Sequence, residues 1–202
     1  MTDTPASPLP SSASAGIRRP LTVAAVQMVS TPDVAANLDA AARLIARAAD
    51  DGARLVALPE YFCLLGQRDA DKLAIRERDG DGPIQTFLAE CAQRHRIWLL
   101  GGTVPLDSGS PTRVRNTSLL YGPDGTRRAR YDKIHLFGFQ RGAERFDESA
   151  TIAAGRTPVV ADVEGWRLGL SVCYDLRFPE LYRTLSPVDL ILVPSAFTYT
   201  TG

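Results

Sequence analysis

The sequence predicts an α/β protein whose sheets mix parallel and antiparallel strands. Over residues 21–104, apolar runs of strand length alternate with segments of helical period, as in parallel strand–helix–strand units. From Arg113 onward, two strand-like runs flank a Gly-Pro-Asp-Gly turn signal at residues 122–125, which indicates an antiparallel hairpin. A further apolar run ends abruptly at Cys173, before Pro179 opens a short helical segment. We therefore expect an α/β sandwich with mixed sheets, organised around the turn at Cys173.

The composition is typical of a soluble globular protein of one domain. The chain has 202 residues, of which 45% are hydrophobic and 23% are charged, enough for one sizeable core. Its 23 basic and 23 acidic residues cancel, so no general electrostatic field attracts nucleic acid or an anionic membrane. No run approaches the roughly 18 apolar residues of a membrane span. We expect neither a nucleic-acid partner nor a membrane partner.

Cysteine and histidine usage indicates a reducing compartment and no metal site. The three cysteines, at 63, 91 and 173, lack C-x-x-C spacing and the chain shows no secretory signature, so we expect a cytoplasmic protein. The two histidines, His95 and His135, belong to no pattern of zinc ligands.

Residues 1–19 are expected to form a disordered leader, and residues 20–202 are expected to form the folded domain. The first 16 residues are rich in Pro, Ser and Ala and contain no long apolar run. This composition is typical of disorder and differs from that of a signal peptide.

The domain is expected to begin with a strand and a helix. The run LTVAAVQM at residues 21–28 predicts a strand that is buried on both faces. Thr31-Pro32 then supplies a helix cap and a first-turn proline. The helix ends near residues 51–52 and has an apolar face that consists of Val34, Leu38, Ala41, Ile45 and Ala48.

Two more strands and a second helix complete the first half. ARLVALPEYF at residues 53–62 predicts a buried strand that ends in Pro59 and Glu60, a helix runs from Pro83 to about His95, and a third strand covers residues 97–104. Functional groups in such units collect at the carboxyl ends of the strands. Glu60 stands at such an end, although an ordinary loop carboxylate would fit there as well.

The second half carries two further candidate positions before the cysteine turn. Lys133 lies within the strand-like run of residues 126–137, just before Ile134, where the strand gives way to a loop and a buried lysine would supply a local cation. Residues 138–150 read as a polar loop that carries Glu148. The run DLILVPSAF, residues 189–197, predicts one more buried strand.

Cys173 is expected to lie on a turn between a strand and a helix. Such a turn lifts a side chain out of the sheet and directs free backbone N–H groups at whatever that side chain attacks, as in other nucleophile elbows. A buried structural cysteine at a strand end explains this segment equally well.

Three blocks along the chain carry a family resemblance. LPEYF around Glu60, YDKIHLF around Lys133 and SVCYDLRFPELYR around Cys173 occur in this order. Together they resemble the signature blocks of the nitrilase superfamily of carbon-nitrogen hydrolases, from about Leu21 to Gly202. CYDLRFPEL with VPSAF is most similar to the Nit branch, which contains omega-amidases and deaminated-glutathione amidases. The resemblance implies an α-β-β-α sandwich that forms a homodimer or a higher homo-oligomer, a small amide as substrate, and no metal or organic cofactor.

By matching position, the resemblance assigns Glu60, Lys133 and Cys173 as a catalytic triad. Glu60 would take the thiol proton, and the thiolate would attack the amide to form a thioester that water later hydrolyses. Lys133 and the N–H of Tyr174 would stabilise the oxyanion. Glu148 aligns with an additional glutamate that the family keeps near its active site. It would hold Lys133 and orient the substrate, or only pin its loop through an ion pair.

Arg177 is the candidate for substrate selection. It lies four residues after Cys173, at the position where carboxylate-binding relatives carry an arginine, and a guanidinium binds a carboxylate through two parallel hydrogen bonds. The competing interpretation is that Arg177 only pairs with Asp175 or Glu180 to hold the turn.

Several alternatives stay open at this stage. Within the enzyme class, an N-carbamoyl amidohydrolase or a nitrilase is the nearest one. A non-catalytic member of the fold that serves interactions and a thiol redox protein, which would need Cys63 close to Cys173, come from other classes. Relatives of the Nit branch continue beyond the position of Gly202, so we also expect the fold to be incomplete at the C-terminus, which leaves an inactive fragment as an alternative.

Overall fold

The computed structural model describes residues 18–142 and 144–197. Most of the expected leader, residues 1–17, therefore lies outside the described residues. Arg18 and Arg19 contact the domain: Arg18 forms an ion pair of 2.6 Å with Asp189 and lies over the ring of Trp166, and Trp166 donates a hydrogen bond to the carbonyl oxygen of Arg19. These contacts fix the start of the domain against its second sheet.

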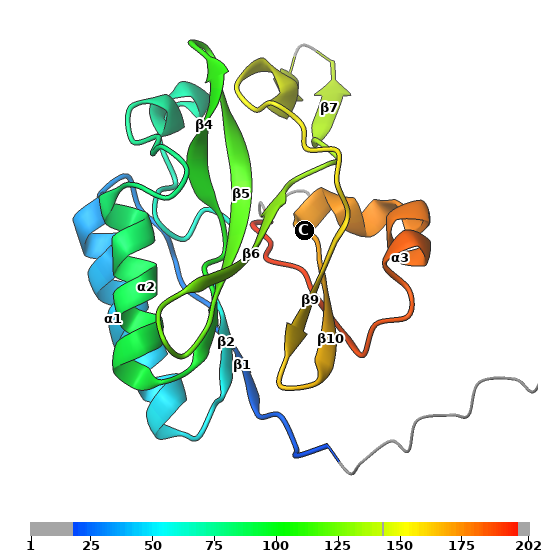
Figure 1. The fold of residues 1–202 in the computed structure, drawn as a ribbon. Helices are drawn as coiled ribbons and strands as arrows, with labels where there is room; N and C mark the ends of the chain where they lie inside the picture. The colour runs from blue at the N-terminus through cyan, green and yellow to red at the C-terminus, as the bar shows by residue number, and fades with distance from the viewer. Residues whose placement is uncertain (1–17, 143, 198–202) are drawn as a thin grey trace, which may run out of the picture.

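The larger sheet has six strands and contains both kinds of pairing (Figure 1). Its strand order is β1-β2-β3-β5-β4, with β6 beside β5, and the pairs β1–β2 and β2–β3 are parallel while the rest are antiparallel. The strands are β1 (Val23–Ala25), β2 (Leu55–Ala57), β3 (Trp98–Leu100), β4 (Val104–Ser110), β5 (Arg113–Tyr121) and β6 (Arg127–Asp132).

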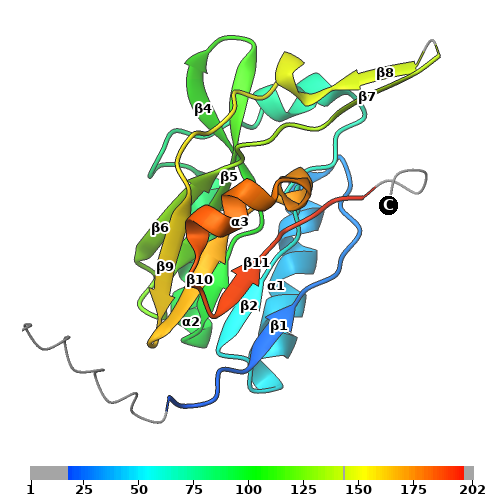
Figure 2. The ribbon, with the colours of Figure 1, turned by 90° about the vertical axis from the view of Figure 1, so that its right-hand side faces the viewer.

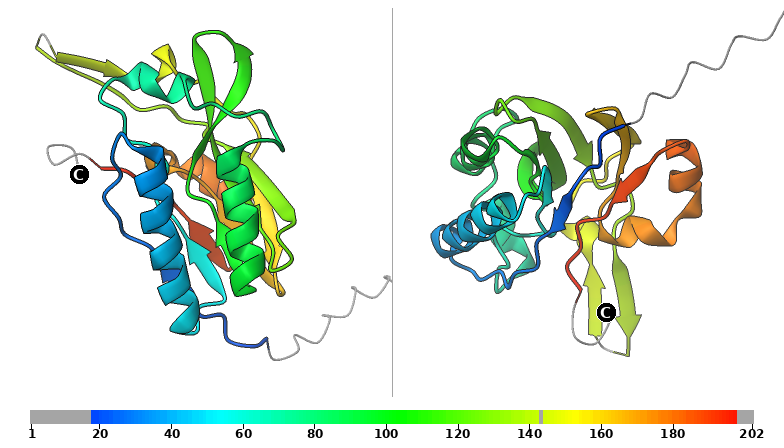
Figure 3. Two further views of the ribbon diagram at one scale, coloured as in Figure 1. Left: turned by 90° about the vertical axis from the view of Figure 1, so that its left-hand side faces the viewer. Right: turned by 90° about the horizontal axis from the view of Figure 1, so that it is seen from below.

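Two helices cover one face of this sheet, as both views of Figure 3 show. They are α1 (Val34–Asp50) and α2 (Pro83–His95). Their apolar faces and the sheet form one core, which includes Ala41, Ile45, Ile84, Leu88, Cys91, Val56, Leu99 and Leu119. The expected cap of α1 is wrong by a residue or two, because the side chain of Asp33 caps the helix by accepting a hydrogen bond from the N–H of Ala36. Thr31 instead bonds to Asn37, a buried polar residue of α1.

The smaller sheet and one helix form the other two layers (Figures 1 and 3). The sheet has the order β11-β10-β9 and consists of β9 (Val159–Val163), β10 (Trp166–Leu170) and β11 (Leu190–Leu192). A second core between the two sheets joins Leu55, Leu100, Leu120 and Tyr131 to Val163, Leu168, Leu170 and Val172. The helix α3 (Pro179–Leu185) packs on the outer face of β10, where Leu185 lies against Gly169. The layers therefore follow the expected α-β-β-α order.

Residues 138–150 differ from the expected polar loop. They form a hairpin of β7 (Gly138–Arg141) and β8 (Glu144–Asp147), followed by a 3₁₀ turn over Glu148–Ala150. Figure 2 shows that the hairpin projects from the body of the domain. Phe139 and Phe146 pair across it, so aromatic side chains stabilise a hairpin that lacks a strong turn signal in the sequence.

The first and last strands are less buried than expected. Val23 in β1 and Ile191 in β11 are each 39% exposed. Among the described strands, β1 pairs only with β2 and β11 only with β10, so each lies at a sheet edge and has a partner on one side only. A continuous apolar run indicates a strand but does not tell a central strand from an edge strand. Within the described residues, no helix is both long enough and apolar enough to cross a membrane.

Candidate active site

Glu60 lies beyond the carboxyl end of the parallel strand β2, three residues after its last residue. Its side chain is buried and its two oxygens are bound from three directions. Its Oε1 accepts from Lys133 Nζ at 3.0 Å and from Nδ2 of Asn116, a residue of β5, at 2.9 Å. Its Oε2 accepts from the backbone N–H of Ala196 at 3.1 Å. Segments that are far apart in the sequence therefore hold one carboxylate at the carboxyl ends of the strands.

Lys133 is the buried cation of the site. It follows β6 directly and is only 1% exposed. Besides Glu60 it binds both oxygens of Glu148, at 3.0 and 2.8 Å. Burial alone would lower the pKa of Lys133, but the charges of Glu60 and Glu148 outweigh burial and raise the pKa above its usual value. Lys133 is therefore a buried positive charge that two carboxylates hold in place.

Glu148 is held as firmly as the lysine it binds. It begins the 3₁₀ turn after β8 and accepts hydrogen bonds from the N–H of Phe137 at 2.7 Å and from the hydroxyl of Tyr61 at 3.0 Å. Its own N–H donates to the carbonyl oxygen of Phe137. Because both oxygens are engaged by the protein, this geometry fits a residue that holds Lys133 and its loop better than one that binds substrate directly.

Cys173 stands at the turn between β10 and α3, as the sequence predicts. It begins a 3₁₀ turn over Cys173–Arg177 and has a φ of +46°, which non-glycine residues rarely adopt. Its N–H donates to the carbonyl oxygen of Pro194 at 2.9 Å. Within the described residues, no acceptor is recorded for the N–H of Tyr174, the next residue, as expected at the first turn of a helix.

The carboxylate and the thiol shift each other's proton affinity. Burial, and to a smaller extent the charge of Glu60, raises the pKa of Cys173 to about 12, although Lys133 opposes this change. Burial likewise raises the pKa of Glu60, against the attraction of Lys133. The resting site therefore favours a neutral thiol next to a carboxylate that is a stronger base than usual, an arrangement suited to proton transfer.

Sequence reasoning missed the group that anchors the cysteine turn. Asp175 is fully buried and accepts hydrogen bonds from Val172 N at 2.9 Å, from the hydroxyl of Tyr131 at 2.6 Å, and from His135 N at 2.9 Å. His135 Nδ1 also lies 2.7 Å from Asp175, and its ring stacks on Phe178. An aspartate two residues after the cysteine was the only signal in the sequence, because Tyr131 and His135 come from distant positions.

A cavity of about 600 Å³ opens onto these groups. Its walls include the four residues Glu60, Lys133, Glu148 and Cys173, and also Tyr174 and Arg177. The apolar part of the wall includes Leu65, Phe137, Phe139, Phe146, Leu176 and Phe197. The structure therefore brings all six sequence-predicted site residues to one cavity.

The guanidinium of Arg177 is available at this cavity. Its two expected structural partners are engaged elsewhere: Asp175 in the contacts described above, and Glu180 in an ion pair of 3.0 Å with Arg183. Among the described side chains, none forms an ion pair with Arg177. The structural alternative to substrate binding thus lacks the contact it requires.

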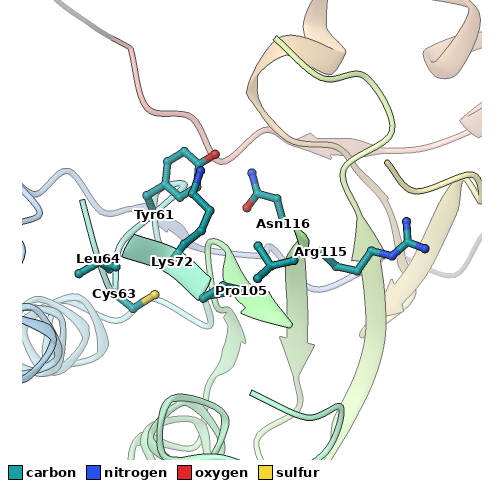
Figure 4. A pocket seen from close by; sticks show the side chains of 8 residues that line it. Tyr61, Cys63, Leu64, Lys72, Pro105, Arg115 and Asn116 are labelled. Atoms are coloured by element: carbon teal, nitrogen blue, oxygen red, sulfur yellow. The ribbon is translucent and has the colours of Figure 1, made fainter. Parts of the chain in front are cut away.

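Cys63 lines a second, much smaller pocket of about 10 Å³ (Figure 4). Cys63 lines this pocket with Tyr61, Lys72 and Asn116, and its thiol donates to the carbonyl oxygen of Thr103. Burial raises the pKa of Cys63 to about 12. Cys63 and Cys173 are both free and line different pockets, so the structure gives no support to a redox pair. Within the described part of the chain, no cluster of three or more His, Cys, Asp or Glu side chains could hold a metal ion.

Comparison with known proteins identifies the family of this chain. The family model for carbon-nitrogen hydrolases matches residues 22–199. The chain belongs to the carbon-nitrogen hydrolase family. This family match and the relatives described next confirm the expected resemblance to the nitrilase superfamily and to its Nit branch.

Individual relatives of this hydrolase carry amidase names. A deaminated glutathione amidase from Synechocystis sp. (strain PCC 6803) is 41% identical over 190 residues, which are 91% of this chain and 69% of the relative. The chloroplastic omega-amidase of Arabidopsis thaliana is 36% identical over 182 residues, which are 87% of this chain and 49% of the relative. The solved structure of Saccharomyces cerevisiae Nit3 matches with a TM-score of 0.76 and 31% identity, and the match covers 89% of this chain and 66% of that one. The chain thus spans between about half and about two thirds of the length of these proteins.

Proposed function

We propose that this carbon-nitrogen hydrolase converts small, linear, carboxylate-bearing amides to the acid and ammonia, as an amidase of the omega-amidase or deaminated-glutathione-amidase type. One observation carries the proposal: a buried Glu60–Lys133–Glu148 network lies beside a cysteine on a strained turn, and all four residues line one cavity.

Glu60 generates the nucleophile in this mechanism. An unactivated amide resists a neutral thiol, so the Cys173 proton must leave as the sulfur attacks. The carboxylate of Glu60, whose pKa is raised by burial, takes that proton. Asn116 and the N–H of Ala196 fix the orientation of the carboxylate, so proton transfer needs no rearrangement of the base.

Lys133 and the backbone stabilise the oxyanion that attack creates. Lys133 is a buried cation, and among the described residues the N–H of Tyr174 has no acceptor, so it can donate to an oxygen bound next to Cys173. Removal of one donor of this kind typically costs on the order of 10²–10³ in rate.

Glu60 then serves both half-reactions. It returns its proton to the amide nitrogen, the C–N bond breaks, and ammonia leaves while the acyl group stays on Cys173 as a thioester. A water molecule replaces ammonia and gives one proton to Glu60, and its oxygen attacks the thioester. The C–S bond breaks, the sulfur regains the proton from Glu60, and the acid departs.

Arg177 supplies the preference for a carboxylate. It lines the cavity near the nucleophile and has no ionic partner among the described residues. A guanidinium of this kind binds a carboxylate through two parallel hydrogen bonds, which places the amide group of a dicarboxylic acid monoamide over Cys173.

We also propose a cytoplasmic protein that forms a homodimer or a higher homo-oligomer. The three free cysteines support a reducing environment, because a catalytic thiol must stay reduced.

A substrate panel with mass spectrometry tests the proposed function. Acidic omega-amides, neutral amides, N-carbamoyl compounds and nitriles are each incubated with the full chain, and ammonia and the acid product are measured. We expect fastest turnover of the acidic amides and an acyl adduct on Cys173 after rapid quench. Cys91→Ala serves as the matched control, since this thiol lies in the helix core. An adduct on Cys63 or Cys91, or turnover restricted to nitriles or carbamoyl compounds, would refute the assignment.

A further inference from the structure

Tyr61, the residue after Glu60, has an unusual backbone conformation. Its φ is +56°, a left-handed value that costs a bulky side chain energy and persists only where the surroundings enforce it. Two contacts do so: the N–H of Tyr61 donates to Thr103 Oγ1 at 2.9 Å, and its carbonyl oxygen accepts from the N–H of Leu64 at 3.2 Å. This conformation lets consecutive side chains reach the same buried network.

The hydroxyl of Tyr61 donates to Glu148. The distance to Glu148 Oε1 is 3.0 Å, and the same oxygen lies 3.0 Å from Lys133 Nζ. The other oxygen, Oε2, is bound by Lys133 and by the N–H of Phe137. The phenol is thus the donor that shares Oε1 with the catalytic lysine.

The ring of Tyr61 is fixed from its outer side. Lys72 Nζ lies 5.4 Å from the ring centroid (Figure 4). Lys72 in turn pairs with Asp69 and donates to Thr151 Oγ1 at 3.3 Å, and Thr151 bonds to Asp69. The N–H of Thr151 returns to the carbonyl oxygen of Glu148. Lys72 and Thr151 therefore connect the ring of Tyr61 to the backbone of Glu148, the residue whose carboxylate its hydroxyl binds.

We propose that Tyr61 is a positioning residue for catalysis, whose hydroxyl fixes Glu148 and, through Glu148, the place of the Lys133 ammonium at the oxyanion. This role rests on the proposed amide hydrolysis and adds a residue to it.

The physical reason is the balance of donors around Glu148. With the hydroxyl present, each oxygen of Glu148 accepts from Lys133 and from one neutral donor. Without it, Oε1 has Lys133 alone, so the carboxylate gains freedom to turn and draws the ammonium toward itself and away from the oxyanion. A hydrogen bond to a charged group in a buried site contributes more than one between neutral groups, and an ammonium displaced by a fraction of an ångström stabilises the transition state less.

The test is a double-mutant cycle in the full chain. Tyr61→Phe keeps the ring and its contact with Lys72 and removes only the hydroxyl. We expect kcat for an acidic amide to fall on the order of tenfold while KM stays within about twofold, because the interaction acts on the transition state. In a Glu148→Gln background, Tyr61→Phe should have no further effect. Tyr121→Phe, which removes the hydroxyl of a buried tyrosine of β5 outside the network, should leave kcat unchanged.

A second readout does not depend on amide turnover. The rate at which iodoacetamide alkylates Cys173 reports the thiolate fraction, and it should fall several-fold in Tyr61→Phe because the negative charge of Glu148 is then less compensated. If the wild type hydrolyses no amide, the proposed function fails, and this rate still decides the role of Tyr61. An unchanged alkylation rate, a loss in KM alone, or an equal loss with and without Glu148 would each overturn the proposal.

Discussion

Replacement of Asp175 by Asn tests how the cysteine turn is held. The change keeps the size of the side chain and replaces one oxygen by an NH₂ group. At present one oxygen accepts from the N–H of Val172 and the hydroxyl of Tyr131, and the other accepts from the N–H and the ring nitrogen of His135. Asp175 is 0% exposed, so water cannot replace a lost partner.

The expected cost follows from these contacts. The hydroxyl of Tyr131 and the ring of His135 can change from donor to acceptor, but the backbone N–H groups cannot. Either orientation of the introduced amide therefore leaves one buried N–H without an acceptor, at about 1–3 kcal/mol. The remaining hydrogen bonds also lose the assistance of the charge, so the sum is about 3 kcal/mol. With a urea dependence of about 2 kcal/mol per molar, the unfolding midpoint should fall by about 1.5 M.

The assay combines urea unfolding with turnover. Because Val172 precedes Cys173 directly, a loosened turn should also lower kcat in buffer without urea, where the variant is still folded. Asp39→Asn, on the exposed side of α1, is the matched control and should leave both quantities unchanged. A midpoint within about 0.3 M of the wild type would refute the view that the Asp175 contacts hold the turn.

The remaining predictions concern the groups that line the cavity. Lys133→Ala should lower kcat by about 10²–10³, as measured by ammonia release, and a loss in KM alone would contradict its role at the oxyanion. Arg177→Lys should raise KM for an acidic amide much more than for its neutral analogue, and equal losses for both substrates would instead favour a structural role. Glu60→Gln should abolish turnover. The pKa of Glu60 is raised above 4.5 in the folded state, so the wild type loses stability as the pH rises from 4.5 through that raised pKa. Gln cannot ionise, so the variant should become more stable relative to the wild type over the same range. Thermal melts of the two proteins at pH 4.5 and 8 decide this. If Tm changes by the same amount between these pH values in both proteins, the raised pKa is contradicted.

Local signals predicted the elements that short-range physics determines. Proline at the first position of α2 and basic side chains in its last turn mark a helix whose observed bounds, Pro83–His95, agree with the sequence. The turn at residues 122–125 joins β5 and β6 as expected. The apolar run that stops at Cys173 likewise locates the end of β10 and the turn that follows it.

Features that depend on distant partners could not be predicted in this way. The edge positions of β1 and β11 follow from the strand order, which the sequence of a single strand does not contain. The β7–β8 hairpin depends on Phe139 and Phe146 meeting across a gap that looks like a polar loop. The contacts of Asp175 with Tyr131 and His135 join residues 40 or more positions apart, so no local window could have contained them.

Two of the residues with a strained backbone lie at the proposed catalytic site. Among the described residues, four that are not glycine have a positive φ, namely Tyr61, Arg96, Glu164 and Cys173. Arg96 is the C-cap of α2, and Glu164 lies in the turn between β9 and β10, where such values are common. Tyr61 instead follows Glu60, the proposed base, and Cys173 is the proposed nucleophile. Neither is a glycine or an asparagine, the residues that favour this conformation. Their strain is compensated by long-range contacts, from Thr103 to Tyr61 and from Pro194 to Cys173. A site that must bring a base and a thiol together therefore departs from local preference at the thiol itself and at the residue directly after the base.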